Sequence, residues 1–249
     1  MIELVTELFP TSEGLSRSTT KALEQVRSAQ EAGVQAMVYV PHFARDNSST
    51  YGDALLNQVE EFQATLQQQA IQMEILAGHT LSLREDLLED LNKGQALSLN
   101  QSSYVLTEFD HETSFRKAEK AVYAFSIEGY IPIILRPEQH PVFLKDPDLL
   151  YRLIKRGALA LVDAGSLAGG NGKAVRKFAE RLAENHLVHC VSTFSERVED
   201  RTRLYARIEK PAASARFQIL EQNTENVVRG NAIHIEQPQH LLKKRFSFF

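Results

Sequence analysis

The sequence predicts an α/β protein with a single domain, built as a closed or nearly closed, TIM-like (β/α)7 barrel of parallel strands with helices outside. Short apolar runs with strand character alternate with longer amphipathic runs, and about seven such units follow one another without a break in composition. The length of 249 residues suits one such barrel. An open doubly wound sheet is the alternative. It would favour a glycine-rich phosphate loop, and the chain contains neither G-x-G-x-x-G nor G-x-x-x-x-G-K-[ST].

Each element has its own signal in the sequence. Short apolar runs indicate strands at residues 2–5, 34–40, 71–77, 104–109, 131–135, 158–162 and 187–193. Apolar residues at helical spacing indicate helices at residues 19–32, 52–70, 83–91, 114–128, 146–156, 173–185 and 211–229. Ser18 and Asp146 precede helices, and Gly33, Gly129 and Gly157 follow them, as helix boundaries require.

Composition narrows the class of protein. Hydrophobic residues make up 43% and charged residues 24%, and no run approaches the ~20 apolar residues of a membrane span. A net charge of −4 gives no general attraction to nucleic acid. The chain begins without the basic segment of a signal peptide, and the single Cys190 permits no internal disulfide, so we expect a cytoplasmic protein. We place a barrel domain at residues 1–231 and a basic, aromatic tail at residues 232–249.

In a parallel barrel, functional side chains lie where the strands end. In chain order these positions hold Glu7, His42, Thr80, Glu108 with Asp110, Arg136 with Glu138, Gly165 with Ser166, and Phe194 with Glu196. A transition-metal site needs at least three well-placed histidine or carboxylate ligands and little competing positive charge. The single histidine and the arginine therefore argue against a metal site at this end of the barrel.

Several segments resemble a known family. They are MIELVTELFP, AQEAGVQAMVYVPHF, LAGHTLSLREDLLEDLNKGQALSLNQSSYVLTEF, GYIPIILRPEQH and DPDLLYRLIKRGALALVDAGSLAGGNGKAVRKFAERLAENHLVH. The chain is similar over roughly residues 1–231 to the bacterial capsule- and exopolysaccharide-operon tyrosine phosphatases of the polymerase-and-histidinol-phosphatase (PHP) superfamily. The resemblance implies a distorted (β/α)7 barrel of the PHP type with a cluster of manganese or similar divalent ions. It also implies dephosphorylation of a bacterial tyrosine kinase that controls polysaccharide export.

The family's chemical motifs are altered in this chain. The opening D-x-H-x-H motif reads Glu3, Val5 and Glu7, and the acidic pair that follows reads Glu13-Gly14. A glutamate after the third strand is Thr80, the H-P-E-R segment reads Arg136-Pro137-Glu138-Gln139, and the final D-x-H reads Phe194-Ser195-Glu196. By this comparison only His42 and Glu108 clearly remain as metal-ligand positions. The family has an arginine a few residues after the final D-x-H; Arg201 matches it and is a candidate anion-binding residue.

Two protein ligands cannot hold a catalytic ion tightly, and without the ion there is neither an activated water nor a clamp on the phosphoryl oxygens. We therefore expect an inactive homologue with no metal cofactor. Its vestigial mouth residues are Glu7, His42, Glu108, Arg136 and Glu196. It would regulate capsule or exopolysaccharide biosynthesis by binding a tyrosine kinase or a polysaccharide-export component.

Two other functions stay open. One is an active metal-dependent phosphotyrosine phosphatase with a rewired site, in which Glu7 and Glu196 join His42 and Glu108. The other is an anion-binding scaffold unrelated to the kinase, with Ser166 in a glycine-rich segment as the binding residue. Metal bound to the purified protein would distinguish the active phosphatase from the anion-binding scaffold.

Two further expectations concern charge. Without metal ions, Glu108 needs a counter-charge, and Arg136 ends the neighbouring strand, so we expect a two-pronged ion pair between them in the mouth. The segment 243–249, KKRFSFF, mixes cations with phenylalanines and can make weak contact with an anionic membrane surface. Self-association into a homo-oligomer is also left open.

Overall fold

The computed structural model of the chain describes residues 1–6, 8–9, 15–109, 114–194 and 211–241. Its strands are β1 (Ile2–Val5), β2 (Ala36–Tyr39), β3 (Glu74–Ala77), β4 (Thr80–Ser82), β5 (Tyr104–Glu108), β6 (Ile131–Leu135), β7 (Leu159–Asp163) and β8 (Cys190–Ser192). Its helices are α1 (Leu15–Glu31), α2 (Gly52–Gln68), α3 (Leu88–Asn92), α4 (Phe115–Ile127), α5 (Pro141–Lys145), α6 (Pro147–Lys155), α7 (Ala164–Leu167), α8 (Lys173–Glu184) and α10 (Pro211–Val228). Four 3-10 turns join them within the described residues: η1 (Ser48–Thr50), η2 (Glu85–Leu87), η3 (Leu99–Gln101) and η4 (Pro137–Gln139).

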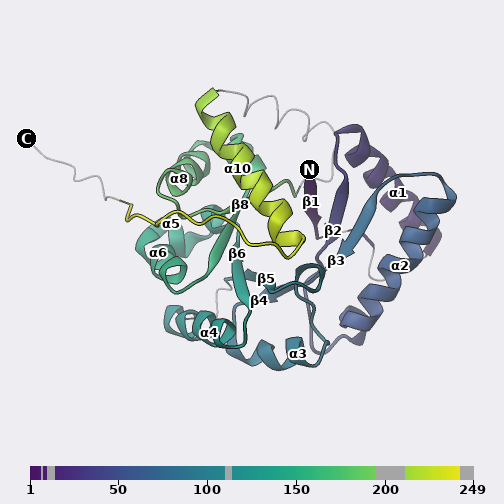
Figure 1. Cartoon of the computed structure of the whole chain (residues 1–249), viewed down its shortest axis with the longest axis horizontal. Helices are drawn as coiled ribbons and strands as arrows, with labels where there is room; N and C mark the ends of the chain where they lie inside the picture. Colours follow the sequence, from purple (N-terminus) through teal and green to yellow (C-terminus); the bar gives the residue numbers. More distant parts are fainter. Residues whose placement is uncertain (7, 10–14, 110–113, 195–210, 242–249) are drawn as a thin grey trace, which may run out of the picture.

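The strands lie side by side in chain order, and every pair is parallel. One ladder joins β1, β2 and β3, and a second joins β4 through β8. The two ladders meet where His42 pairs with Thr80 in a parallel bridge, and the Phe43 N–H donates to the Thr80 carbonyl at 3.0 Å. Figure 1 shows the strands near the centre, with helices around them. The predicted α/β barrel is therefore confirmed, although the third strand is split into β3 and β4.

The ring of strands is not closed by a backbone ladder. No strand pairing joins β1 to β8 in the described residues. Instead, the Leu4 N–H donates to the Ser192 hydroxyl at 3.0 Å, and the Thr193 hydroxyl donates to the Glu3 carboxylate. Side chains thus hold the seam between the first and last strands.

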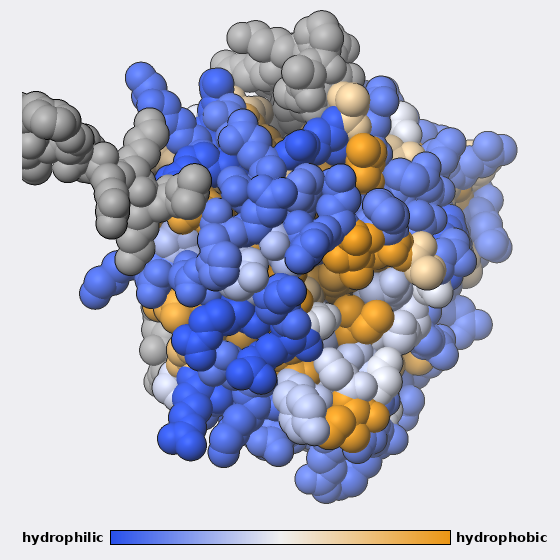
Figure 2. All heavy atoms as spheres, turned by 60° about the vertical axis from the view of Figure 1, so that its left-hand side comes forward, coloured by the Kyte–Doolittle hydropathy of each residue, from blue (hydrophilic) through white to orange (hydrophobic). Residues whose placement is uncertain are grey.

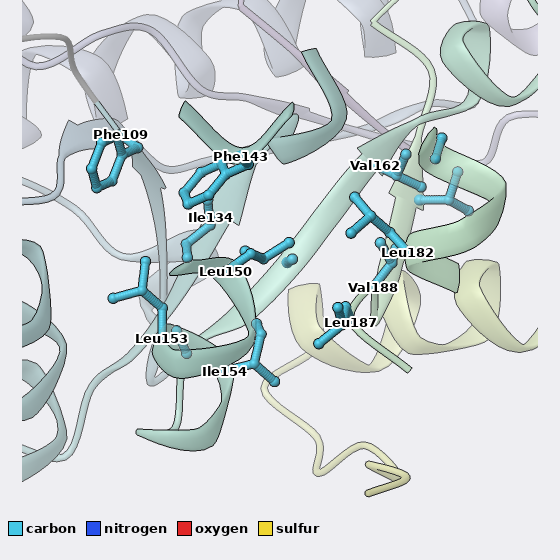
Figure 3. Packing of buried hydrophobic residues seen from close by; sticks show 14 of the residues in the cluster. Phe109, Ile134, Phe143, Leu150, Leu153, Ile154, Val162, Leu182, Leu187 and Val188 are labelled. Atoms are coloured by element: carbon cyan, nitrogen blue, oxygen red, sulfur yellow. The ribbon is translucent and has the colours of Figure 1, made fainter. Parts of the chain in front are cut away.

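Apolar side chains fill both faces of the strand layer. Leu4, Val38, Leu106, Ile133 and Leu161 belong to the cluster inside the ring, and all are almost fully buried. A second cluster lies between the outer face of β6 and β7 and the helices around it. Figure 3 shows Phe143, Leu150, Leu153 and Leu182 pointing into this cluster. Because both faces are covered, the backbone of the strands is held in place up to their ends.

The last described residues form a segment without helix or strand, which we call the C-terminal strap (residues 231–241). It leaves the end of α10 and runs towards α6 (Figure 1). Ile233 packs against the inner cluster, the Gln239 N–H donates to the Asn185 carbonyl at 2.9 Å, and the His240 ring lies 3.6 Å from the Tyr151 ring. The domain boundary at residue 231 stays a prediction.

The surface in Figure 2 is mostly hydrophilic, with hydrophobic areas separated by polar ones. Among the described residues, no helix combines the length and apolar character needed to span a bilayer. The tail at residues 243–249 lies outside the described residues, so its membrane contact stays a prediction.

Candidate functional site

The described candidate residues follow the carboxyl ends of their strands, as predicted. His42 comes after β2 and is exposed, Glu108 is the last residue of β5, and Arg136 directly follows β6. In a parallel ring these ends share one edge, which we call the mouth. Three predicted site residues, Glu7, Glu196 and Arg201, lie outside the described residues.

Arg136 and Glu108 form an ion pair across neighbouring strands. The Arg136 Nη2 donates to Glu108 Oε1 at 3.0 Å, and each side chain is 35% exposed. The Phe194 ring lies beneath the guanidinium, with its centroid 5.2 Å from the guanidinium carbon. The predicted pairing is confirmed, but it uses one nitrogen and not two. The pair is half-buried, so its contribution to stability lies nearer that of a surface pair.

The backbone aims Arg136 into this position. Its φ of 49° is left-handed, which is uncommon for a residue other than glycine, and its N–H donates to the Leu161 carbonyl at 2.8 Å. Pro137 follows and begins η4. The hydrogen bond to β7 and the proline hold a turn that an isolated chain would not favour.

A second polar group lies beside the ion pair. Its members are Glu138, Gln139, Asp163, Ser166 and Asn171. The Gln139 Nε2 lies 3.3 Å from Glu138 Oε1, 3.1 Å from Asp163 Oδ2 and 3.0 Å from Ser166 Oγ. Because an amide nitrogen carries only two N–H donors, these three oxygens must share them. Asn171 Nδ2 also donates to Asp163 and Ser166, each at 3.0 Å.

Two carboxyls in this group, the buried Glu138 and the partly buried Asp163, have raised pKa values. Glu138 has no exposed surface, and burial raises its pKa to about 7, although the Ser166 hydroxyl and backbone N–H groups oppose the shift. Burial also raises the pKa of Asp163, while the Gly165 N–H, Asn171 and Arg136 lower it less. Burial therefore makes both carboxyls give up their protons less readily, and Glu138 is only partly ionised at neutral pH.

Sequence reasoning missed Asp163. The strand predicted at residues 158–162 ended one residue short of it, and attention went to Ser166. A signal was available, because Asp163 precedes Ala-Gly in a run where it can cap a turn. Its Oδ1 accepts from the Gly165 N–H at 2.8 Å, and a Cβ at Gly165 would lie 3.1 Å from the same oxygen. The Ser166 hydroxyl is buried and bonded within the group; its role as an anion ligand stays a prediction.

His79 adjoins Thr80, which stands where the family has a glutamate, but it is not placed to bind a metal ion in that glutamate's stead. Its Nδ1 accepts from the Leu97 N–H at 2.8 Å, so the neutral ring carries its proton on Nε2. Burial lowers its pKa to about 4. Neither ring nitrogen then offers a lone pair to an ion. This agrees with strand alternation, which turns His79 away from the face that holds Thr80.

The residue types suit a divalent ion, but the described residues do not complete a site. His42, Glu108 and Asp163 offer nitrogen and carboxylate oxygen donors. In the part of the chain that the structure describes, no three histidine, cysteine, aspartate or glutamate side chains come together as a metal site. The residues outside that part include the further candidate ligands Glu7 and Glu196, and also Glu13.

A barrel-like ring of parallel strands, with His42 and Glu108 where the strands end, places the chain in the class of TIM-like barrels of the PHP type. Within this class, the chain belongs to the CpsB/CapC family of capsular polysaccharide synthesis proteins, whose family model matches residues 1–237.

Relatives match over most of this chain. The tyrosine-protein phosphatase YwqE of Bacillus subtilis is 29% identical over 255 residues, which covers 100% of both chains. The tyrosine-protein phosphatase CpsB of Streptococcus agalactiae is 20% identical over 235 residues, covering 92% of this chain and 93% of CpsB. A chain from a crystallographic study of YwqE from Bacillus subtilis and CpsB from Streptococcus pneumoniae, described as unique metal-dependent tyrosine phosphatases, matches with a TM-score of 0.87. It is 28% identical, and the match covers 98% of this chain and 100% of that one.

These findings correct two expectations. The inactive, regulatory interpretation and the absence of a metal cofactor are both wrong, because the full-length relatives are tyrosine phosphatases and the matching structure is described as metal-dependent. The error came from counting matched motif positions one at a time. A glutamate in place of a histidine, as at Glu7 or Glu196, exchanges a nitrogen donor for an oxygen donor and keeps ligand chemistry.

Proposed function

We propose that this chain is a metal-dependent phosphatase that removes phosphate from phosphotyrosine in a protein of capsule or exopolysaccharide biosynthesis. The observation that carries the proposal is the match over the whole chain, in sequence to YwqE and in fold to a chain from the study of YwqE and CpsB. The chemistry of the mouth adds to it, since His42 and Glu108 occupy strand ends from which an ion can be held.

The metal would be held by His42 and Glu108, with Glu7 and Glu196 as further candidate ligands. When bound, it supplies an activated water and stabilises charge on the phosphoryl oxygens. Arg136 brings a positive charge to the same edge, and Phe194 fixes its guanidinium. Burial raises the pKa of Glu138 to about 7, so this carboxyl is only partly charged near neutral pH, which favours an anionic substrate.

The substrate we propose is a bacterial tyrosine kinase or another phosphotyrosine protein of the export machinery. This chain would act on it in the cytoplasm. The family's place in capsular polysaccharide synthesis supports this choice. Pulldown with the purified full-length chain would test it. Recovery of a tyrosine-phosphorylated kinase supports this partner, and recovery of no phosphotyrosine protein contradicts it.

The activity has a direct test. The purified chain should release phosphate from a phosphotyrosine peptide with Mn²⁺, and EDTA should abolish the release. His42→Ala and Glu108→Gln should lower both activity and the metal content found by elemental analysis. Glu119→Gln is the matched control, because that carboxylate pairs with Arg152 and Arg156 away from the mouth. No turnover with Mn²⁺, Zn²⁺ or Co²⁺ would show the proposal to be wrong.

A further inference from the structure

We propose that Arg136 is a phosphate-binding residue of this site, and that Phe194 and Glu108 hold its guanidinium ready for the substrate. This inference deepens the proposed phosphatase function and rests on it for the nature of the ligand, a phosphate monoester on an aromatic ring. It assigns the phosphate contact to a side chain where the family motif has a histidine.

Arg136 has donors to spare. A guanidinium carries five N–H donors, and among the residues that the structure describes, the Nη2 contact to Glu108 uses one of them. Its other described contacts are the stacked Phe194 ring and an electrostatic influence on Asp163. The side chain is 35% exposed at the mouth. The remaining donors can therefore reach a ligand that enters there, and their fork matches two oxygens of a phosphate.

The contact with Glu108 does not prevent this. The ion pair is single and partly exposed, and such pairs are weak because solvent screens them. A phosphate dianion offers more charge and more acceptor oxygens than the one carboxylate oxygen now in contact. Glu108 thus holds the guanidinium in place without using up its capacity to bind an anion.

The position of Arg136 is fixed in advance. Its left-handed backbone, the hydrogen bond to Leu161 and the following Pro137 set the direction in which the side chain leaves the chain. The ring of Phe194 then restricts the guanidinium to one face. A long side chain that is already ordered loses less conformational freedom when it binds, so the geometry favours a ligand contact.

The site has a matched internal control. Arg152 also pairs with a carboxylate, Glu119, at 2.8 Å, and it also stacks on a phenylalanine, Phe115, at 4.5 Å. It lies on α6 and pairs with α4, whereas Arg136 and Glu108 lie at the ends of strands. If an arginine with such contacts mattered only for structure, replacing Arg152 and replacing Arg136 would have similar effects.

The test uses the full-length, metal-loaded protein and the variants Arg136→Gln, Arg136→Lys and Arg152→Gln. Calorimetric titration with inorganic phosphate gives affinity, and steady-state kinetics with p-nitrophenyl phosphate gives KM and kcat. We expect Arg136→Gln to weaken phosphate binding and raise KM by about tenfold or more. Arg136→Lys should recover part of the loss, and Arg152→Gln should stay within about twofold of the unchanged protein.

The outcomes separate the two proposals. Unchanged phosphate affinity and KM in Arg136→Gln, with activity present, would overturn the role of Arg136 alone. Phosphate binding that depends on Arg136 in a protein without turnover would overturn the phosphatase function and leave the assignment of Arg136 standing. If thermal unfolding shows that Arg136→Gln is not folded, Arg136→Lys tests the assignment instead. Weakened phosphate binding by Arg136→Lys supports the role of Arg136, and unchanged binding refutes it.

Discussion

The carboxyl group of Glu138 caps the end of the strand that carries Asp163. Its Oε1 accepts from the Asp163 backbone N–H at 3.2 Å, while its Oε2 has no hydrogen-bond partner among the described residues. A fully buried carboxyl whose second oxygen accepts no hydrogen bond from the described residues is poorly suited to carry a negative charge. This explains why burial raises the pKa of Glu138 to about 7.

The first prediction concerns the free energy of unfolding between pH 4.5 and 7. The unfolded chain releases the Glu138 proton near pH 4.5, whereas the folded chain keeps it until about pH 7. The folded state therefore binds more protons in this window, and this group makes stability fall as pH rises through it. Glu138→Gln should remove that slope and gain stability relative to the unchanged protein above pH 7.

Urea unfolding at several pH values checks this prediction. The exposed Glu128 provides a control, and Glu128→Gln should leave the slope unchanged. An equal slope in the Glu138→Gln variant and the unchanged protein would contradict it.

The second prediction concerns acid and has the opposite sign. His189 is buried, its Nδ1 accepts from the Ala160 N–H at 3.1 Å, and burial lowers its pKa to about 4. The unfolded chain takes up this proton near pH 6.5, so stability falls as pH falls from about 6.5 to about 4. His189→Asn keeps an acceptor for the Ala160 N–H and should flatten the fall, as followed by thermal unfolding. His234 is exposed, so His234→Asn should not flatten the loss of stability in acid. A similar effect of both variants would argue against the burial of His189 as the cause of that loss.

The third prediction gives the strength of the Arg136–Glu108 pair. Both side chains are 35% exposed, so solvent screens the contact. A double-mutant cycle with Arg136→Gln and Glu108→Gln should give a coupling of about 1 kcal/mol or less. The larger loss of ~3–5 kcal/mol that follows removal of one partner from a fully buried pair is not expected. Coupling above about 2 kcal/mol in urea unfolding would mean that the pair is more buried in solution.

The fourth prediction tests the C-terminal strap with two isoleucines. Ile233 is partly buried against the inner cluster, whereas Ile235 is 51% exposed. Ile233→Ala should lower the free energy of unfolding by about 1–2 kcal/mol, below the ~2–5 kcal/mol of a fully buried site. Ile235→Ala should change it by less than about 0.5 kcal/mol. Equal effects in chemical unfolding would show that the strap does not support the barrel.

Local signals predicted the regular elements well. The strand expected at residues 131–135 is β6, and the helix expected at residues 114–128 is α4, within one residue at each end. Both rest on patterns that the segment itself contains: an apolar run and a helical stripe that ends at Gly129. Such segments are fixed by their own sequence once they can bury one face.

Elements that depend on distant partners were missed. The strand β4 has three residues, and its pairings with β5 and His42 cannot be read from its own pattern. The short helix α5 was missed for a different reason, because its signals were present. Pro141 begins it, and the His140 Nδ1 accepts from the Val142 N–H at 3.3 Å.

The residues of the candidate site also fall into those that local patterns predict and those that depend on distant contacts. Strand ends located His42, Glu108 and Arg136, and charge balance predicted the ion pair. Asp163 and the buried polar group around it were missed, because their contacts form only when η4 lies against α7 and α8. Activity was misjudged because residue types at matched positions do not show how many donors converge in space.

The side-chain seam between β1 and β8 has a consequence for synthesis on the ribosome. Leu4 and its hydrogen-bond partner Ser192 are 188 residues apart. At about 5–20 residues per second, roughly 10–40 s pass between the two. Throughout that time the outer edge of β1 is without its final neighbour on the nascent chain. A chaperone that covers this edge should raise the yield of folded protein during synthesis. It should raise the yield less when the finished chain is refolded.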